Sequence, residues 1–357
     1  MIRVREGVVV RVRAQWPGAR ELQVTMDGQE VRALAYTCEV GAPEPGDRVI
    51  LNATALLLGL GTGGYAMVVA IVNRLPDDPS PGPGHLVKAR YTPLQTTVLG
   101  VDEQDSAHHD TLRQADDLAG MPVVVADLHS ALPAIVAGAR AHNAGLRIAY
   151  VMTDGGALPI AFSRTVATLQ ETGWIAATIT VGQAYGGDYE AVSLHSGLLA
   201  AKHVIGADLV VVAQGPGNLG TGTQWGFSGV VAGEALNATG TLGGRPIGSL
   251  RVSQADLRER HHGVSHHSLT AYGRVALVPS EIVVPVLDGE LGYRVREQAA
   301  PLAARHTLVE QSCDGLVDAL RESPARLSTM GRGLDEDTAS FLAAAVAGRF
   351  AAQGPAC

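Results

Sequence analysis

The first 75 positions of the chain contain several short runs with the pattern of β-strands. The valines and arginines of residues 7–14 follow the two-residue period of a strand with one buried face. Asp27-Gly28, between two further runs, is typical of a two-residue β-hairpin turn. Five short strands in so few residues predict a small barrel of SH3-like or OB-like type over residues 1–75. The predicted strands cover residues 7–14, 21–26, 29–37, 48–52 and 65–73.

Residues 53–72 form an uncharged stretch that is long enough to span a membrane. Glycines at positions 59, 61, 63 and 64 interrupt it where a turn is expected. The apolar runs on both sides therefore predict two buried strands joined by a glycine loop. We expect a soluble protein, and the same region is a candidate interface of a homo-oligomer.

The pattern changes after the proline- and glycine-rich segment PDDPSPGPG at residues 76–84. From about residue 120, short apolar runs alternate with stretches of helical period. This alternation predicts a mainly parallel, doubly wound sheet with helices on both faces. The expected strands are 122–126, 147–152, 176–181, 208–213, 246–252 and 275–278, and the expected helices are 131–143, 160–172, 189–205 and 227–238.

Four segments follow from this division of the chain. The predicted barrel is followed by a linker and connecting segment, then by a Rossmann-like α/β domain, and then by C-terminal helices that pack on that domain. The predicted segments are residues 1–75, 76–119, 120–300 and 301–357.

Composition narrows the function classes. Hydrophobic residues make up 46% and charged residues 17% of the 357, which is typical of a globular protein. The formal net charge of −8 disfavours a broad surface for a phosphate backbone. Trp16, Tyr36 and Tyr65 are too few to form a base-stacking stripe on the barrel. We therefore expect no nucleic-acid partner.

The cysteines and the N-terminus indicate a cytoplasmic protein. Cys38, Cys313 and Cys357 are odd in number and far apart, which favours a reduced compartment and gives no cysteine-based zinc motif. The sequence MIRVREGVVV lacks the apolar core and cleavage site of a signal peptide.

Polar and glycine-rich sequence follows five of the predicted strands. In open parallel sheets, ligands bind outside the carboxyl ends of the strands. We therefore predict a site at this edge of the sheet. The five strand exits are residues 127–130, 153–156, 182–188, 215–223 and the segment from 253 to the histidines at 261–267.

The loop GPGNLGTGT, residues 215–223, contains four glycines between an apolar strand and a helical stretch. Backbone N–H groups in such a loop can hold a phosphate or a carboxylate. It is not a Walker A loop, because no Gly-Lys-Ser/Thr follows. The alternative is a tight loop that needs glycine for positive φ and close packing. The candidate anion-binding residues are Gly215, Gly217, Gly220, Thr221, Gly222 and Thr223.

Asp127 and His129 project to one side of an extended Asp-Leu-His segment, since alternate side chains lie together. With other acids and histidines they could form an O/N-ligand metal site. The alternative is that Asp127 and Asp154 cap the helices that follow them.

Four histidines lie within seven positions in RHHGVSHHS, residues 260–268. His262 and His266 would share a helix face, but Gly263 argues against a continuous helix, and Ser265 could instead cap a helix that starts at His266. No HExxH motif is present. Crowded histidines repel when protonated, which lowers the pKa of at least one and favours a neutral ligand or base. The alternative is a solvated histidine-rich turn.

These exits supply two sets of candidates. The candidate catalytic residues are Asp127, His129, Asp154 and His266, and the candidate metal ligands are Asp127, His129, Asp188, His262, His266 and His267.

Five motifs occur in one order along the chain: GDRVILNATA, YVMTDGGALPIAFS, GQAYGGDYEAVSLHSGL, GPGNLGTGTQWGFSG and HHGVSHHS. Together they resemble a family of uncharacterised bacterial proteins, domain of unknown function 3866. The resemblance covers nearly the whole chain and implies a soluble bacterial protein, but it carries no activity and no catalytic residues.

Together the motifs favour a hydrolase or transferase that acts on a small anionic or phosphorylated substrate, with or without a divalent metal. Redox chemistry is disfavoured because no redox cofactor motif is complete. The alternative is a non-catalytic metabolite sensor or scaffold whose barrel contacts a protein partner.

Overall fold

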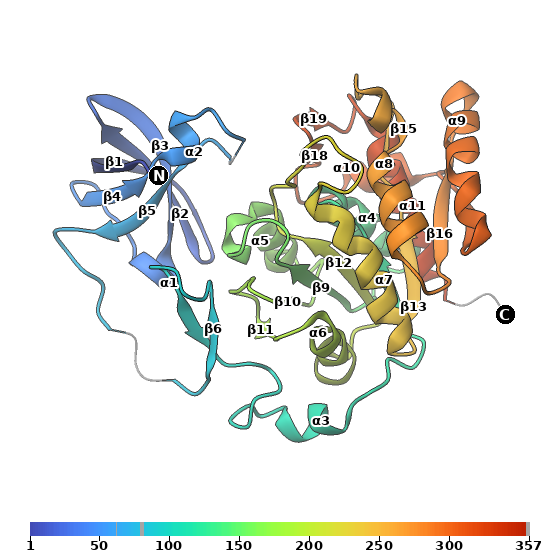
Figure 1. Ribbon diagram of the computed structural model, residues 1–357, viewed down its shortest axis with the longest axis horizontal. Helices are drawn as coiled ribbons and strands as arrows, with labels where there is room; N and C mark the ends of the chain where they lie inside the picture. The colour runs from blue at the N-terminus through green and yellow to red at the C-terminus, as the bar shows by residue number, and fades with distance from the viewer. Residues whose placement is uncertain (62, 79–81, 355–357) are drawn as a thin grey trace.

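A closed five-stranded barrel occupies the N-terminal part of the computed structural model, which describes residues 1–61, 63–78 and 82–354 (Figure 1). The order around it is β1-β2-β3-β5-β4, which confirms the predicted barrel. Asp27 and Gly28 both have positive φ, as the turn between β2 and β3 requires. The strands are β1 (Val4–Trp16), β2 (Ala19–Met26), β3 (Gln29–Tyr36), β4 (Arg48–Asn52) and β5 (Ala66–Ile71), with the short helix α1 (Thr37–Val40) after β3.

The prediction of two strands within residues 53–72 is wrong for the first of them. The Asn52 side chain accepts a hydrogen bond from the Thr54 N–H, so the chain turns out of the barrel where β4 ends. The short helix α2 (Thr54–Leu57) follows, and Leu58 and Leu60 beyond it are exposed. No helix in the described ranges has the length and apolar content needed to cross a membrane.

A connecting segment links the barrel to the second part of the chain. It contains the antiparallel pair β6 (Leu86–Lys88) and β7 (Thr96–Val98), and the helix α3 (His109–Gln114). Part of the predicted proline- and glycine-rich boundary (79–81) and Cys357 lie outside the described residues.

An eight-stranded parallel sheet forms the core of the second part, as predicted. Its central strands β8, β9 and β12 are almost entirely buried, which explains their continuous apolar runs. The order is β11-β10-β9-β12-β8-β13-β16-β17. The strands are β8 (Pro122–Val125), β9 (Ile148–Thr153), β10 (Ala177–Thr180), β11 (Tyr189–Glu190), β12 (Leu209–Gln214), β13 (Arg245–Ser249), β16 (Glu281–Val286) and β17 (Thr307–Ser312).

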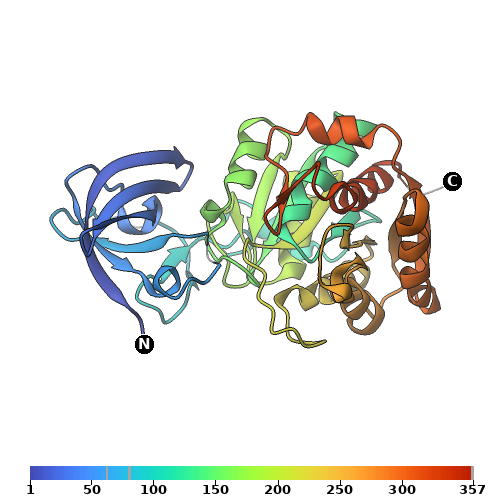
Figure 2. The ribbon, with the colours of Figure 1, turned by 90° about the horizontal axis from the view of Figure 1, so that it is seen from above.

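Helices cover both faces of this sheet (Figure 2). One face carries α4 (Leu132–His142), α5 (Arg164–Glu171), α10 (Leu316–Arg321) and α11 (Thr338–Ala352). The other carries α6 (Leu194–Ala200), α7 (Val231–Thr241), α8 (His266–Thr270) and α9 (Gly289–Ala299). The fold is therefore doubly wound.

The strand predicted at 275–278 is wrong. A π-helical turn (Ala271–Val275) continues α8, and the Asn237 side chain then bonds the Val275 carbonyl and the N–H groups of Leu277 and Val278. These backbone groups therefore need no neighbouring strand. The strand β16 begins six residues after Val275 instead.

The C-terminal segment was predicted to be helical, and it also contains strands. The edge strand β17 lies there, as does the small hairpin of β18 (Ser328–Thr329) and β19 (Arg332–Gly333). The strand β17 is only half-buried, so its apolar pattern is weak.

The helices α4 and α11 approach each other closely through glycine. A Cβ atom on Gly138 would collide with the Ala345 carbonyl oxygen, and one on Gly348 would collide with the Ile135 carbonyl oxygen. The close packing of this face therefore requires glycine at both positions.

We expect Gly138→Ala to lower the free energy of unfolding by about 1–3 kcal/mol, because an added methyl group must push two backbones apart. Alanine otherwise favours a helix by about 1 kcal/mol over glycine, so a net loss isolates the collision. Denaturant unfolding measures the effect. Gly145→Ala, at a site with room for a Cβ atom, is the control, and an equal change in both variants would contradict close packing.

Candidate functional site

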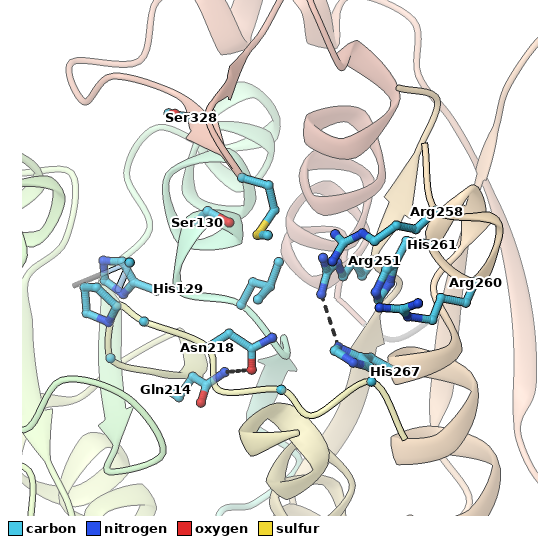
Figure 3. A pocket seen from close by; sticks show the side chains of 18 of the residues that line it. His129, Ser130, Gln214, Asn218, Arg251, Arg258, Arg260, His261, His267 and Ser328 are labelled. Carbon is cyan, nitrogen blue, oxygen red and sulfur yellow. Dashed lines mark hydrogen bonds between the residues drawn. The ribbon is translucent and has the colours of Figure 1, made fainter. Parts of the chain in front are cut away.

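A cavity of about 480 Å³ lies at the carboxyl edge of the sheet, where β8, β12 and β13 end (Figure 3). Three segments form most of its wall: residues 128–130, 214–222 and 251–267. Thr165 of α5, Ser328 and Met330 of the β18–β19 hairpin, and Gly61 in the loop between α2 and β5 complete it.

The strand order places the cavity at a change of direction in the sheet. The chain leaves β8 toward β9 on one side, whereas it leaves the neighbouring β13 toward β16 on the other. Loops that diverge in this way open a crevice between them, which is where open α/β sheets bind ligands.

Arg251, Arg258 and Arg260 line one side of the cavity (Figure 3). Arg258 is paired with Asp256 through two hydrogen bonds of 2.9 and 2.7 Å. Among the residues that the structure describes, Arg260 has no carboxylate within 4.0 Å. The wall therefore carries an excess of positive charge.

Asp127 lies at the end of β8 with only 3% of its surface exposed. Its Oδ2 atom is 3.8 Å from both Arg251 Nη1 and His267 Nδ1, and has no hydrogen-bond partner in the described part of the chain. The helix α4 that follows has no side-chain cap, so Asp127 is not the predicted alternative, a helix cap.

Three of the histidines form a cluster, but His261 takes the place predicted for His262. The centroid of the His261 ring lies 5.0 Å from the His266 centroid and 5.0 Å from the His267 centroid. The His266 and His267 centroids lie 4.4 Å apart. Gly263 has φ +75°, which turns the chain between His262 and the helix. His262 consequently lines a separate hollow with Glu290 and Arg294.

Ser265 caps α8 as predicted, since its side chain accepts a hydrogen bond from the His267 N–H. The same hydroxyl lies 2.8 Å from His261 Nδ1, so one serine orders both parts of the cluster. Phe227 stacks on the His267 ring at 3.8 Å and holds it in place.

Burial, followed by the charges of Arg251 and Arg258, lowers the pKa of His261 to about 3. Burial, followed by His267 and Arg260, lowers the pKa of His266 to about 4. Both imidazoles are therefore neutral at neutral pH. The lowered pKa values agree with the prediction from histidine crowding, although burial is the larger cause of the shift.

His129 lines the cavity, but both of its ring nitrogens have partners. Its Nε2 atom lies 2.7 Å from Ser163 Oγ, and its Nδ1 atom lies 3.1 Å from the Tyr150 hydroxyl. Tyr150 in turn donates to the Gln214 carbonyl. Burial lowers the pKa of His129 to about 4. This chain orders the exits of β8, β9 and β12 and leaves His129 no free nitrogen for a metal.

The glycines of the predicted anion loop line the cavity, whereas its threonines do not. Gly215, Gly217, Gly220 and Gly222 form the wall. The hydroxyl groups of Thr221 and Thr223 bond to each other and to the backbone of Gly226. The alternative, a tight loop that needs glycine, also holds in part. Gly217 has φ +97°, and a Cβ atom on Gly215 would collide with Ala157.

Asp154 and Asp188 do not line the cavity. Asp154 accepts a hydrogen bond from the Gln183 N–H at 2.9 Å, and α5 is capped by Ser163, so the alternative role of Asp154 as a helix cap is also absent. Asp188 accepts hydrogen bonds from the N–H and hydroxyl of Thr178. Both carboxylates thus bind neighbouring loops and strands.

Four basic side chains of the cavity wall were not among the candidates that the sequence supplied: Arg251, Arg258, Arg260 and His261. Arg258, Arg260 and His261 belong to the segment after the fifth predicted strand, where the basic residues were the available signal. Arg251 fell inside that predicted strand, whereas β13 ends at Ser249.

A family model described as "Protein of unknown function (DUF3866)" matches residues 32–348. The chain belongs to this family. The match contains every segment of the cavity wall, from Gly61 to Met330. No curated protein and no solved structure matches the chain.

We expect His129→Gln to flatten the dependence of stability on pH. The ordinary histidine pKa is about 6.5, so the unfolded chain takes up this proton at a higher pH than the folded protein, whose His129 has a pKa of about 4. The contribution of His129 to the free energy of unfolding is complete above pH 6.5 and is lost as the pH falls toward 4. The slope for this one proton is at most about 1.4 kcal/mol per pH unit.

Denaturant unfolding at a series of pH values from 7 to 4 measures this slope. His142→Gln, which changes an exposed histidine at the end of α4, is the matched control. A slope for His129→Gln that equals that of the wild type would contradict the burial of a neutral His129.

Proposed function

We propose that the chain is a hydrolase or transferase whose substrate is a small anionic molecule, with a phosphoryl group as the preferred anion. One observation carries the proposal: three arginines and a glycine loop face one cavity at the carboxyl edge of the sheet. Arginine binds phosphate and carboxylate oxygens through paired N–H groups.

The glycine loop supports anion binding because it approaches the cavity with backbone alone. Gln214 fixes the start of this loop by donating from Nε2 to the Asp127 carbonyl and to Asn218 Oδ1. Ser228 in turn donates to Asn218 Oδ1 and accepts from the Leu219 N–H. Such a braced loop can present N–H groups to an anion at little cost in ordering.

The imidazole cluster supplies the groups that favour an enzyme over simple binding. His261 and His267 line the cavity beside the arginines. We propose that this cluster assists the attack of a water or an alcohol hydroxyl on the bound group, while the leaving group departs and the released proton passes to solvent. Asp127 acts as a positioning residue, since its charge orients Arg251 and His267.

A metabolite sensor is the second candidate, and the barrel supports it. Gly61, in the loop between α2 and β5, lines the cavity. The barrel also contacts the α/β part through Trp16, whose Nε1 atom donates to the Ala161 carbonyl at 2.6 Å. A bound anion could therefore change how the barrel is held.

Calorimetric titration with inorganic phosphate and pyrophosphate tests the anion site. We expect Arg251→Gln and Arg260→Gln each to weaken binding about 10- to 100-fold, because each removes a charge-assisted hydrogen bond of about 1.5–3 kcal/mol. Added salt should weaken binding to the wild type. Arg296→Gln, an exposed change on α9, is the matched control. Equal effects from all three substitutions would contradict a cavity site.

Turnover then separates the enzyme from the sensor. A panel of phosphomonoesters and acyl phosphates is screened for release of inorganic phosphate, and Asp127→Asn is compared with the wild type. We expect Asp127→Asn to bind phosphate at least as well, because it removes a negative charge, while kcat falls about 100-fold. Tight phosphate binding without turnover of any substrate would favour the sensor.

A further inference from the structure

We propose that His261, His266 and His267 bind a divalent transition metal ion, with zinc as the first choice, in the wall of the cavity. Each ring offers one nitrogen, and these three atoms all lie within 4.8 Å of one another. Imidazole nitrogen suits zinc, copper, nickel and iron, whereas magnesium and calcium prefer oxygen ligands.

Unsatisfied polar atoms support a ligand at this place. His266 Nε2 is buried and has no hydrogen-bond partner among the described residues. Such an atom is costly unless a ligand, an ion or a water satisfies it. His261 uses Nδ1 to contact Ser265 Oγ, which leaves its Nε2 atom for a metal.

Asp127 supplies the second supporting observation. Its Oδ2 atom, also buried and without a partner in the described part of the chain, lies 3.8 Å from His267 Nδ1. Histidines that bind metal commonly donate their second ring N–H to a carboxylate. In the structure His267 Nδ1 lies 3.2 Å from Arg251 Nη1, which can only donate, so Nδ1 accepts there (Figure 3). A metal on His267 Nε2 would require the tautomer with Nδ1–H, whose proton would turn from Arg251 to Asp127 Oδ2.

The geometry requires a modest contraction of the cluster. Zinc–nitrogen bonds of about 2.0–2.1 Å in a tetrahedron place the ligand nitrogens roughly 3.3–3.5 Å apart. The nitrogens must therefore approach each other by up to about 1.5 Å, which side-chain rotation at the first turn of α8 and at His261 can provide.

Three protein ligands leave a fourth coordination position, as in catalytic zinc sites. His261 and His267 line the cavity, so that position faces the bound anion. Binding of the metal stands on the three rings alone, whereas its role in activating water or polarising the anion rests on the proposed function.

The nearby arginines do not exclude a cation. Arg258 is neutralised by Asp256, and Arg251 lies beside Asp127. The positive charges of Arg260 and of the metal would both attract the same anion. Binding of the metal and binding of the anion would therefore support each other.

Metal binding is tested on full-length protein that is stripped with a chelator and dialysed against Zn²⁺ or Co²⁺. We expect one ion per chain by elemental analysis. His261→Gln, His266→Gln and His267→Gln should each weaken the affinity at least about 100-fold, and Asp127→Asn about 10- to 100-fold. His262→Gln is the matched control, since it changes an adjacent histidine that lies in a separate hollow.

A second measurement needs no variant. The wild-type Co²⁺ complex should show the visible absorption of four-coordinate cobalt and paramagnetically shifted resonances from three imidazole rings. Absence of stoichiometric metal in the wild type, or an equal loss of affinity in His262→Gln, would overturn the proposal.

Phosphate titration of the metal-free protein keeps the two proposals apart. If phosphate binds through the arginines but no metal binds, the metal site alone fails. If the metal binds but no phosphate or phosphoester does, the metal site stands and the proposed function fails.

Discussion

The buried carboxylate of Asp127 is the constraint on which the carboxyl edge of the sheet depends. It ends β8, a central strand, where burial of an isolated charge costs several kcal/mol unless an opposite charge lies close by. Arg251, just after β13, supplies that opposite charge, and its guanidinium also contacts His267 Nδ1 in the first turn of α8. Balancing this charge holds the segment after β13 across the exit of β8, so His261 and His267 face the cavity. His266 lines a neighbouring hollow with Arg260 and Arg274 instead.

The same residue also anchors the glycine loop, because the Gln214 side chain donates to the Asp127 carbonyl. The backbone and the side chain of one residue thus contact the exits of two other strands. A negative charge lies beneath the cavity and an excess of arginine lies in its wall. Asp127 lies beside Arg251 and Asp256 is paired with Arg258, so both of these arginines are held near a carboxylate.

The barrel and the central sheet could be predicted because their burial follows a regular period along the chain. The strand β16 was missed because Pro285 lies within it. In the structure Pro285 pairs only with β17, since the pairing with β13 ends at Val283. The position of the cavity could also be predicted, because parallel strands place all their exits at one edge. That His261 belongs to the histidine cluster could not be predicted, because its position depends on the turn that Gly263 makes.

Whether a carboxylate at a strand exit joins a site depends on the backbone donors beside it. Asp154 meets the Gln183 N–H, and Asp188 meets the Thr178 N–H and hydroxyl, so their charges are engaged in holding loops and strands together. The Oδ2 atom of Asp127 has no such donor among the described residues, and its charge is left to act on Arg251 and His267. Asp127 and Asp154, which follow β8 and β9, therefore differ in chemistry because the tertiary fold offers a backbone donor to only one of them. Asp188 is a different case, since it directly precedes β11 and lies beside Thr178, toward the amino end of β10. Residue type and strand position could not distinguish these cases, since the donors come from other segments of the chain.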